Sequence, residues 1–405
     1  MPTTSYDIII IGAGLVGAAL ACDLARDGNR RIAVVEAGGE PAEFTGTAFD
    51  PRVVALSKAS QSFLSAIDAW PQIAASRPCA YTDMHVWDAE GTASIHFDCR
   101  ELHQPNLGHI VENSVALRAV RQRLHAGSNI DLLQPAKVAD LTAPRSENDT
   151  VTVTIDDQRQ LHSPLVIGAD GAQSLVRRLA QFETREWDYG HKAIITTVRT
   201  EQPHNHVARQ RFLRTGPLAF LPLQEAHAED HHSCYSSIVW SAEEALADQL
   251  LAMDDASFCQ ALGEAFEFTL GPVTSCAQRF CLPLRQRHAV QYVQPGIALV
   301  GDAAHSLHPL AGQGVNLGLL DAAVLGEEIA RAGRRDLPLA EPSILARYQR
   351  RRLGHNLGAM GAMEGFKRLF GEDQLPARWL RNEGMARLDG LPLLKHFIAK
   401  QAIGL

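Results

Sequence analysis

Short apolar runs and segments of helical periodicity alternate through the first part of the chain. Residues 6–11 form a largely β-branched run that is typical of a strand buried on both faces. Residues 18–27 then show the pattern of a helix, which Gly28 ends, and residues 31–35 repeat the strand pattern. A strand–helix–strand order of this kind predicts an α/β layer built on a parallel sheet.

Two later apolar runs also end at a glycine. Residues 165–168 and 297–300 are predicted to be buried strands, and a helix is expected after the second one, through about Ala330. Between these runs, residues 192–200 and 236–240 have the pattern of antiparallel strands. The chain is therefore expected to contain a parallel layer with a mostly antiparallel sheet inserted into it.

The first strand leads directly into Gly12-Ala13-Gly14-Leu15-Val16-Gly17. The first glycine permits a tight turn, the second lets the backbone approach a pyrophosphate, and the third lets helix and strand pack closely. The helix that follows offers free N–H groups and a positive dipole end to phosphates. Glu36, 22 residues after Gly14, can accept hydrogen bonds from a ribose. This context predicts a dinucleotide-binding turn, but it does not choose between FAD and a nicotinamide cofactor.

Two further motifs favour FAD. Asp170-Gly171 and Gly301-Asp302 each lie at the end of an apolar strand, where either pair alone could be a structural joint. An acid at such a strand end suits the polyol chain of a flavin, so Asp302 is expected at the ribityl. Gly312 and Gly314 would let the backbone lie against a flat ring, at the start of a helix whose positive dipole end suits a reduced flavin.

With these motifs the chain resembles the single-component flavoprotein aromatic hydroxylases, whose fold is similar to that of p-hydroxybenzoate hydroxylase. The resemblance covers nearly the whole chain. Within that family it is most similar to the ubiquinone-biosynthesis hydroxylases, and among these to the 2-polyprenylphenol hydroxylases that act at ring C5. The segments that carry this closer similarity are residues 52–57, 108–113, 187–189, 219–223 and 308–314.

The resemblance implies an α/β fold with a Rossmann-like FAD-binding layer, an inserted and mostly antiparallel substrate sheet, and a C-terminal helical region. The FAD-binding domain is expected at residues 1–75, 105–180 and 275–350, the substrate-binding domain at 76–104 and 181–274, and the helical region at 351–405. Because the chain has a single GxGxxG motif, we expect no separate nicotinamide domain. NAD(P)H would then dock transiently, near Asp170 and Gly171.

The resemblance also assigns roles to residues. Arg52, Pro309 and His308 are the expected catalytic residues, with Arg52 beside the cofactor and Pro309 against the flavin face, although an exposed arginine is often only solvated. His305 and His308 are candidates by position for the base that deprotonates a phenol, or else packing and capping residues. The expected cofactor-binding residues follow the motifs and their neighbours: Gly12, Ala13, Gly14, Leu15, Val16, Gly17, Glu36, Ala37, Arg52, Val138, Asp170, Gly171, Gly301, Asp302, Pro309, Gly312, Gln313, Gly314, Val315 and Asn316.

The implied reaction is hydroxylation of a polyprenylated phenol on the way to ubiquinone. In the family, NAD(P)H reduces FAD, and O2 then forms a flavin C4a-hydroperoxide that transfers oxygen to the ring. Three alternatives stay open: another ring position, a soluble phenol, and a lipid-carrier protein on the same fold. The intact Asp302 and loop 312–314 favour an enzyme over a carrier, and the absence of a Trp-x-Trp pair disfavours a flavin halogenase.

Composition narrows the partners and the compartment. A chain of 405 residues has room for two or three domains, and its net charge of −8 disfavours nucleic acid. The seven cysteines are scattered and odd in number, without a C-x-x-C pair, which indicates a reducing compartment. Residues 8–22 are apolar but too short to span a bilayer, and no basic residue precedes them, so we expect a cytoplasmic protein without an export signal.

Two polar or amphipathic segments have more than one interpretation. His227, His231, His232 and Cys234 are expected to lie in a polar hairpin loop rather than to bind a metal. Residues 351–405 contain nine Lys or Arg and five Asp or Glu, with apolar residues at helical spacing. They could pack on the core, pack on a second subunit of a homo-oligomer, or lie on anionic lipid. A polyprenylated substrate favours peripheral association with the cytoplasmic membrane and contact with other ubiquinone-biosynthesis proteins.

Overall fold

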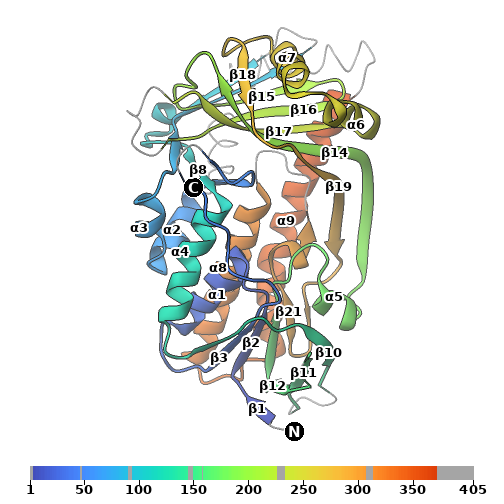
Figure 1. Ribbon diagram of the computed structural model, residues 1–405. Coiled ribbons are helices and arrows are strands. Elements are labelled where there is room, and N and C mark those ends of the chain that lie inside the picture. The colour runs from blue at the N-terminus through green and yellow to red at the C-terminus, as the bar shows by residue number, and fades with distance from the viewer. Residues whose placement is uncertain are drawn as a thin grey trace.

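A computed structural model describes residues 3–45, 48–89, 94–144, 149–156, 158–225, 233–306 and 313–371. The molecule has a lower body of helices around a parallel sheet and an upper layer built on a larger sheet (Figure 1). Among the residues described, none of the helices combines the length and apolarity that a membrane crossing requires.

The lower body is organised around a six-stranded sheet in the order β20-β21-β13-β2-β3-β9, parallel except for β20. In chain order, its strands are β2 (Ile8–Ile11), β3 (Ile32–Val35), β9 (Ile130–Leu133), β13 (Leu165–Gly168), β20 (Val293–Gln294) and β21 (Ile297–Leu299). The helices around it are α1 (Leu15–Ala25), α4 (Asn113–Ala126), α5 (Leu175–Leu179), α8 (Gln313–Gly333) and α9 (Pro342–Gly371). The central strands are buried throughout, as their apolar runs predict.

Two small sheets flank this body. At its lower end lies a four-stranded sheet of β1 (Thr3–Ser5), β12 (Gln160–Ser163), β11 (Val151–Ile155) and β10 (Val138–Thr142). Nearer the upper layer, β4 (Val53–Leu56), β8 (Gly108–Glu112) and β5 (Cys79–Tyr81) form a three-stranded antiparallel sheet, beside α2 (Lys58–Ala66) and α3 (Trp70–Ala74).

The upper layer is a nine-stranded sheet in which every pair is antiparallel except β15 with β6. Its strands, in sheet order, are β22 (His305–Ser306), β19 (Phe280–Ala289), β14 (Thr184–Thr200), β17 (Tyr235–Glu243), β16 (Gly216–Pro222), β15 (Val207–Leu213), β6 (Asp83–Asp88) and β7 (Ser94–Asp98), with β18 (Val273–Cys276) paired to β14. Helices α6 (Glu244–Ala252) and α7 (Asp255–Ala265) cover its upper face. Two short 3-10 helices, η1 (Cys99–Leu102) and η2 (Gly301–Ala303), complete the described elements.

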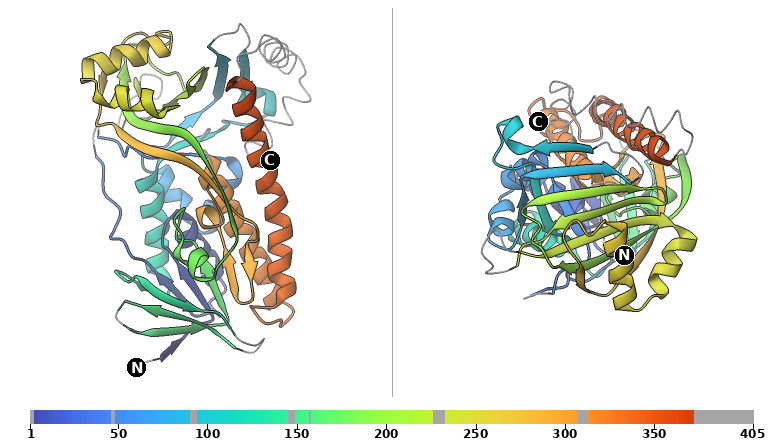
Figure 2. Two further views of the ribbon diagram at one scale, coloured as in Figure 1. Left: turned by 90° about the vertical axis from the view of Figure 1, so that its right-hand side faces the viewer. Right: turned by 90° about the horizontal axis from the view of Figure 1, so that it is seen from above.

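Strands β14 and β19 connect the two levels. Figure 2 shows them running as one long curved ribbon from the lower body to the upper sheet. Three apolar clusters follow this division. The largest fills the lower body, a second lies between the upper sheet and α6 and α7, and a third joins the underside of the upper sheet to the β4–β8–β5 sheet.

The α/β layer and the inserted, mostly antiparallel sheet expected from the sequence are both present. Helix α1 begins at Leu15, earlier than the predicted start at residue 18, because Gly14 already serves as its N-cap. The predicted strand at residues 192–200 is the upper half of β14. In the C-terminal region, α9 begins at Pro342, ahead of the expected boundary at residue 351.

Candidate functional site

The glycine turn between β2 and α1 divides its three glycines by role. Gly12 has φ +103°, and a Cβ there would lie 2.5 Å from the carbonyl oxygen of Ala169. A Cβ on Gly17 would lie 2.1 Å from the Gly12 carbonyl oxygen. At Gly14, by contrast, a Cβ would meet no atom within 4 Å. Two glycines are therefore required by the fold itself, while the middle one leaves open space for a group that approaches the backbone.

The N-terminus of α1 opens at this turn. Its N-cap, Gly14, provides no side-chain hydrogen bond, and the first turn carries no acidic residue. The first N–H groups of the helix are thus available to an external acceptor. Together with the helix dipole, they suit a phosphate.

Glu36 and Arg121 lie beside the turn. The Glu36 carboxylate accepts hydrogen bonds from the Ala13 and Gly38 amides, each at 2.6 Å. Arg121 is 4% exposed and donates to the carbonyl oxygens of Ala13 at 3.1 Å and Gly39 at 3.0 Å. Arg121 was not among the residues expected from the sequence. The one sequence feature that could have indicated its burial is its position on the apolar face of the α4 helix.

Asp170 organises the second motif. Its carboxylate accepts hydrogen bonds from Ser174 Oγ at 2.5 Å, Leu175 N at 2.7 Å and Val176 N at 3.1 Å, and so caps α5. Gly171 has φ +79° with open space around its Cβ position. Asp170 therefore shapes the turn, and Gly171 is the residue that a ligand could approach.

The third motif is held by hydrogen bonds to Asp321, a fully buried residue of α8. Its carboxylate accepts hydrogen bonds from Gly301 N at 3.0 Å and from His305 Nε2 at 2.5 Å, at the two ends of the turn that contains Asp302. Arg352 Nε donates to it at 2.7 Å and Asn356 Nδ2 at 3.1 Å, both from α9. Burial alone would raise the pKa of Asp321, but the His305 and Arg352 side chains hold it below its ordinary value.

The exposed Asp302 therefore lies in a turn that is held at both ends by buried charged side chains of α8 and α9. A Cβ on Gly314, at the start of α8, would lie 3.8 Å from Asp302 Oδ1, so these two motif residues are neighbours. His305 is fully buried and bound to Asp321, away from any surface that a substrate could reach. No local sequence pattern singles out Asp321, Arg352 or Asn356.

The remaining expected residues occupy different settings. Arg52 is exposed and directly precedes β4. Asn316 is buried, accepts hydrogen bonds from Ser57 N and Ser60 Oγ, and donates to the Ala55 carbonyl oxygen, so it ties α8 to β4 and α2. Three more are exposed or half-buried: Ala37, Val138 and Val315.

Some expected residues lie outside the described ranges. His308, Pro309 and Gly312 fall in 307–312, and Gln313 is described only as part of α8. The histidines proposed as a polar loop, His227, His231 and His232, fall in 226–232. Within the described ranges, no group of three or more His, Cys, Asp or Glu residues could hold a metal ion.

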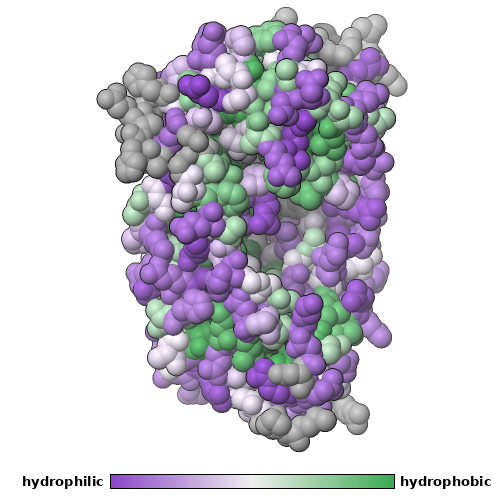
Figure 3. Space-filling model, in the orientation of Figure 1, coloured by the Kyte–Doolittle hydropathy of each residue, from purple (hydrophilic) through white to green (hydrophobic). Residues whose placement is uncertain are grey.

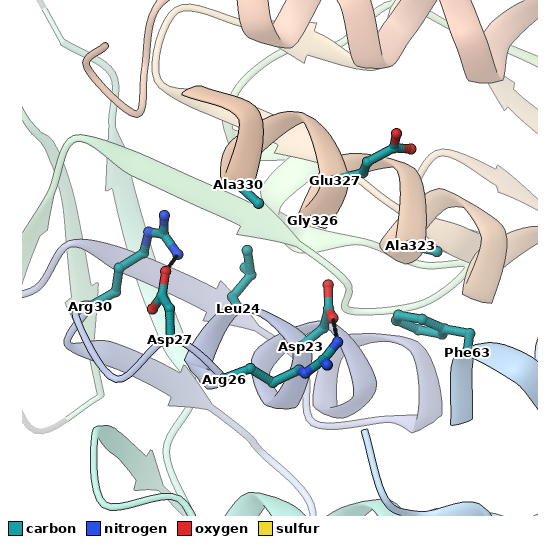
Figure 4. A pocket seen from close by; sticks show the side chains of 10 residues that line it. All are labelled: Asp23, Leu24, Arg26, Asp27, Arg30, Phe63, Ala323, Gly326, Glu327 and Ala330. Carbon is teal, nitrogen blue, oxygen red and sulfur yellow. Dashed lines mark hydrogen bonds and ion pairs between the residues drawn. The ribbon is translucent and has the colours of Figure 1, made fainter. Parts of the chain in front are cut away.

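Two surface pockets are formed by described residues. One of about 330 Å³ lies between α1, α2 and α8 (Figure 4), where Arg26 pairs with Asp23 and Arg30 with Asp27. It lies beside the C-terminal half of α1, away from the glycine turn, and its arginines are already paired. The other, of about 460 Å³, lies between α5, β14 and β19. On the face drawn in Figure 3, the surface is also hollowed near its middle, between the lower body and the upper sheet.

Comparison with known proteins gives this geometry a context. Residues 5–360 match the family described as FAD binding domain. The chain is 37% identical over 406 residues to 3-demethoxyubiquinol 3-hydroxylase of Escherichia coli K12, with all of both chains covered. It is 36% identical to ubiquinone hydroxylase UbiL of Rhodospirillum rubrum, covering 98% of this chain and 89% of the relative. It is 34% identical to the human mitochondrial ubiquinone biosynthesis monooxygenase COQ6, covering 98% of this chain and 92% of the relative.

Solved structures show the same fold. The p-nitrophenol 4-monooxygenase PnpA of Pseudomonas putida superposes with a TM-score of 0.77 at 19% identity, covering 100% of this chain and 99% of that one. PqsL of Pseudomonas aeruginosa superposes with a TM-score of 0.77 at 22% identity, covering 95% and 100%. At these identities the likeness concerns the fold.

Proposed function

The chain belongs to the FAD binding domain family, and from that premise we propose that it hydroxylates ring C5 of a 2-polyprenylphenol on the way to ubiquinone. It is an FAD-dependent aromatic hydroxylase. The observation that carries the ubiquinone assignment is the similarity, over nearly the whole chain, to relatives whose names place them in ubiquinone formation. The assignment of ring C5 rests on the segment similarities, such as residues 52–57 and 108–113.

The residues present fit FAD. The open space at Gly14 and the uncapped start of α1 would receive the pyrophosphate, and Glu36 could accept hydrogen bonds from the ribose. Asp302 would bind the ribityl chain. When bound, FAD supplies the redox chemistry that uses NAD(P)H and O2 to hydroxylate a ring.

The protein's own contribution is binding, orientation and exclusion of water. The turn that presents Asp302 is fixed at both ends by the buried Asp321, so the cofactor site is preorganised rather than built on binding. The upper sheet packs against the β4–β8–β5 sheet through the third apolar cluster. A phenol held between these layers would be shielded from solvent.

We place the docking of NAD(P)H at the pocket between α5, β14 and β19. Three arginines line it, Arg177, Arg178 and Arg287, and Arg287 pairs with Glu186, the acidic residue among its lining, which leaves an excess of positive charge. Arg177 is 6% exposed and donates to two carbonyl oxygens, those of Ala303 and Ala172. An excess of positive charge in a protein of net charge −8 suits a phosphate-bearing reductant.

The exposed Arg178 provides the test of this docking site. Arg178→Glu should raise the KM for NADPH or NADH by about tenfold with little change in kcat, because a charge contact is reversed and the flavin site is untouched. Arg335→Glu, at another exposed arginine, is the control. Equal KM values in the two variants would exclude the pocket.

A second regiochemistry has its own support. The Escherichia coli relative, which aligns from end to end, carries the name 3-demethoxyubiquinol 3-hydroxylase, so the same chemistry at a later step of the pathway is the second candidate. Both candidates share the FAD site and differ in how the ring is held.

The lipid-quinone profile of a strain lacking this gene separates the candidates. Accumulation of 2-polyprenylphenol with loss of ubiquinone is the expected result for C5 hydroxylation. Accumulation of 3-demethoxyubiquinol would instead support the later step. An unchanged quinone pool would contradict both and point to a soluble phenol as substrate.

Association with a membrane through the C-terminal region is a further part of this proposal, because a polyprenyl chain resides in the bilayer. Arg352 and Asn356 lie within that region but bind Asp321, so a test by truncation must keep α9. A chain ending at Gly371 should retain FAD and sediment less with anionic vesicles. Equal sedimentation of the truncated and full-length proteins would exclude a role for residues 372–405.

A further inference from the structure

Two buried carboxylates and one largely buried arginine side chain lie at the segment that leads to Arg52. Asp50 is 2% exposed and Glu112 is 4% exposed. Glu112 accepts hydrogen bonds from Arg77 Nε at 2.6 Å and Arg77 Nη2 at 2.9 Å, in a two-pronged pair. The side chain of Arg77 is 9% exposed and comes from the connection between α3 and β5.

This ion pair holds the backbone ahead of Arg52. Glu112 Oε1 also accepts a hydrogen bond from Asp50 N at 2.7 Å. Arg77 Nη2 donates to the Ala48 carbonyl oxygen at 2.6 Å, and the guanidinium carbon lies 4.3 Å from the centre of the Phe49 ring. Three consecutive residues are thereby attached to one ion pair.

Asp50 passes this restraint on to Arg52. Its carboxylate accepts a hydrogen bond from Arg52 N at 2.9 Å and another from Ser114 N, also at 2.9 Å, at the start of α4. The Arg52 carbonyl oxygen accepts from Asn113 N at 2.9 Å, which extends the pairing of β4 with β8. Both backbone polar groups of Arg52 are therefore fixed.

The side chain of Arg52 contrasts with its backbone. Arg52 is exposed, and its guanidinium has no hydrogen bond or ion pair with the described part of the chain.

The buried charges that hold its backbone are not needed for stability alone. Apolar residues in place of Arg77 and Glu112 could give equal or better stability, because burying charges is costly. Apolar residues would not accept the N–H groups of Asp50, Arg52 and Ser114. The charged set is thus suited to orienting a backbone rather than to stabilising a core.

We propose that Arg77 and Glu112 are positioning residues that hold Arg52 at the flavin through Asp50. The inference rests on the proposed place of Arg52 beside the cofactor. It gives a role to two segments that the sequence singled out, residues 52–57 and 108–113, which the β4–β8 ladder brings together.

The test is a double-mutant cycle on the FAD-loaded enzyme. Arg77→Lys keeps the charge but not the two-pronged contact, and Arg52→Ala removes the guanidinium. Each should slow anaerobic reduction of the flavin by NADPH or NADH, by about 10- to 100-fold if the misplacement approaches 1 Å. In the Arg52→Ala background, Arg77→Lys should cause no further loss of rate, while its effect on the melting temperature of the apoprotein persists.

Several results would overturn the inference. A loss of rate on Arg77→Lys that is equally large without the Arg52 guanidinium would make the network structural. An unchanged rate in Arg77→Lys would exclude positioning, and an unchanged rate in Arg52→Ala would remove Arg52 from the flavin site and the inference with it. Either of the last two results could occur while the quinone profile still supports the proposed function, so the two proposals fail separately.

Controls separate positioning from folding. Arg123→Lys alters an exposed arginine of α4, 3.4 Å from Asp68, and should leave both rate and stability unchanged. Phe49→Leu loosens the ring contact of Arg77 without removing a charge, and a smaller loss of rate is expected. If Arg77→Lys fails to bind FAD, the same cycle is run with Phe49→Leu, where additive losses would contradict the proposal.

Discussion

Gly14 and Gly17 belong to one turn, yet a methyl group at each would meet different surroundings. At Gly17 it would collide with the Gly12 carbonyl oxygen at 2.1 Å, while at Gly14 it would meet nothing within 4 Å. The first collision is with backbone, which has little room to give way. The glycine motif predicts close packing at Gly17 and the approach of a pyrophosphate at Gly14, and only the structure shows how much space each position has.

This difference predicts opposite phenotypes. Gly17→Ala should destabilise the apoprotein by about 1–3 kcal/mol through overpacking. Gly14→Ala should leave the melting temperature of the apoprotein unchanged but weaken FAD binding by about 10- to 100-fold, since the loss of a hydrogen bond to a charged group costs about 1.5–3 kcal/mol. Thermal melts of apoprotein and FAD titration by fluorescence measure the two effects. A destabilised Gly14→Ala apoprotein would contradict the assignment of the open space.

His204 is a neutral histidine whose two ring nitrogens are both engaged. Its Nε2 lies 3.0 Å from the Leu223 carbonyl oxygen, and its Nδ1 accepts a hydrogen bond from His206 N at 3.1 Å. Burial lowers the pKa of His204 to about 4, although the bond to Leu223 opposes this shift. A proton on Nδ1 would break the bond from His206, so the neutral form is built into the connection between β14 and β15.

A pH dependence of stability follows from this arrangement. Below an ordinary pKa of about 6.5 the unfolded chain takes up a proton that folded His204 accepts only near pH 4, so stability falls as the pH drops through this window. The loss amounts to about 2 kcal/mol at pH 5. In urea denaturation at pH 7.5 and 5, His204→Gln should lose stability less steeply than the wild type. His125→Gln, at an exposed site, should lose as much stability between pH 7.5 and pH 5 as the wild type. If His204→Gln also lost as much as the wild type, His204 would not be the source of the pH dependence.

At the scale of elements, α8 and α9 are joined by a buried charged cluster. Asp321 of α8 binds Arg352 and Asn356 of α9, and it also holds Gly301 and His305 at the two ends of the turn that contains Asp302. Through Asp321, the C-terminal helix would therefore support the proposed cofactor site. Its role is to neutralise the buried carboxylate that fixes the turn.

Removal of the cationic partner tests this link. Arg352→Met should cost about 3–5 kcal/mol, because it leaves a buried carboxylate with reduced compensation, and it should also weaken FAD binding. Arg350→Met, two positions earlier on an exposed face, should be neutral within about 0.5 kcal/mol. Urea denaturation and FAD titration of the pair provide the comparison. Unchanged FAD affinity in a destabilised Arg352→Met would confine Asp321 to a structural role.

The elements show where sequence reasoning works and where it stops. The buried strands and the helix after Gly14 follow from local patterns, because apolar runs and glycines act over a few residues. Arg121, Asp321 and Arg77 were not identified, because each gains its role from a partner distant in the chain: Ala13, Arg352 and Glu112 in turn. A single arginine or aspartate in a helix pattern has the same local signal whether it is solvated or buried against a charge.

For the molecule as a whole, the interleaving of the two layers was predictable but their contact was not. The antiparallel patterns of residues 192–200 and 236–240 indicated a second sheet. They did not indicate that β14 would begin in the lower body at Thr184, or that β6 would join β15 in parallel. Such pairings depend on which surfaces remain to be covered after each layer has formed, and a local pattern does not contain that information.

The upper layer nevertheless has an apolar core of its own. Phe258 of α7 is fully buried there, with its ring centroid 6.4 Å from that of Trp240 in β17. Leu20 of α1 is fully buried in the lower core. The two cores include different helices, so a substitution in one core should increase local unfolding first in its own layer.

Phe258→Ala and Leu20→Ala test this division directly. Phe258→Ala should cost about 3–5 kcal/mol and Leu20→Ala about 2–5 kcal/mol, from lost burial and a residual cavity. Hydrogen exchange should then speed up in β15–β17, α6 and α7 for the first variant, with FAD affinity unchanged. For the second it should speed up in β2, β3 and α1, with loss of FAD. If Phe258→Ala instead caused loss of FAD and faster hydrogen exchange in β2, the two layers would unfold as one cooperative unit, joined by the long β14–β19 ribbon. The proposed flavin site would then depend on the upper sheet for its stability.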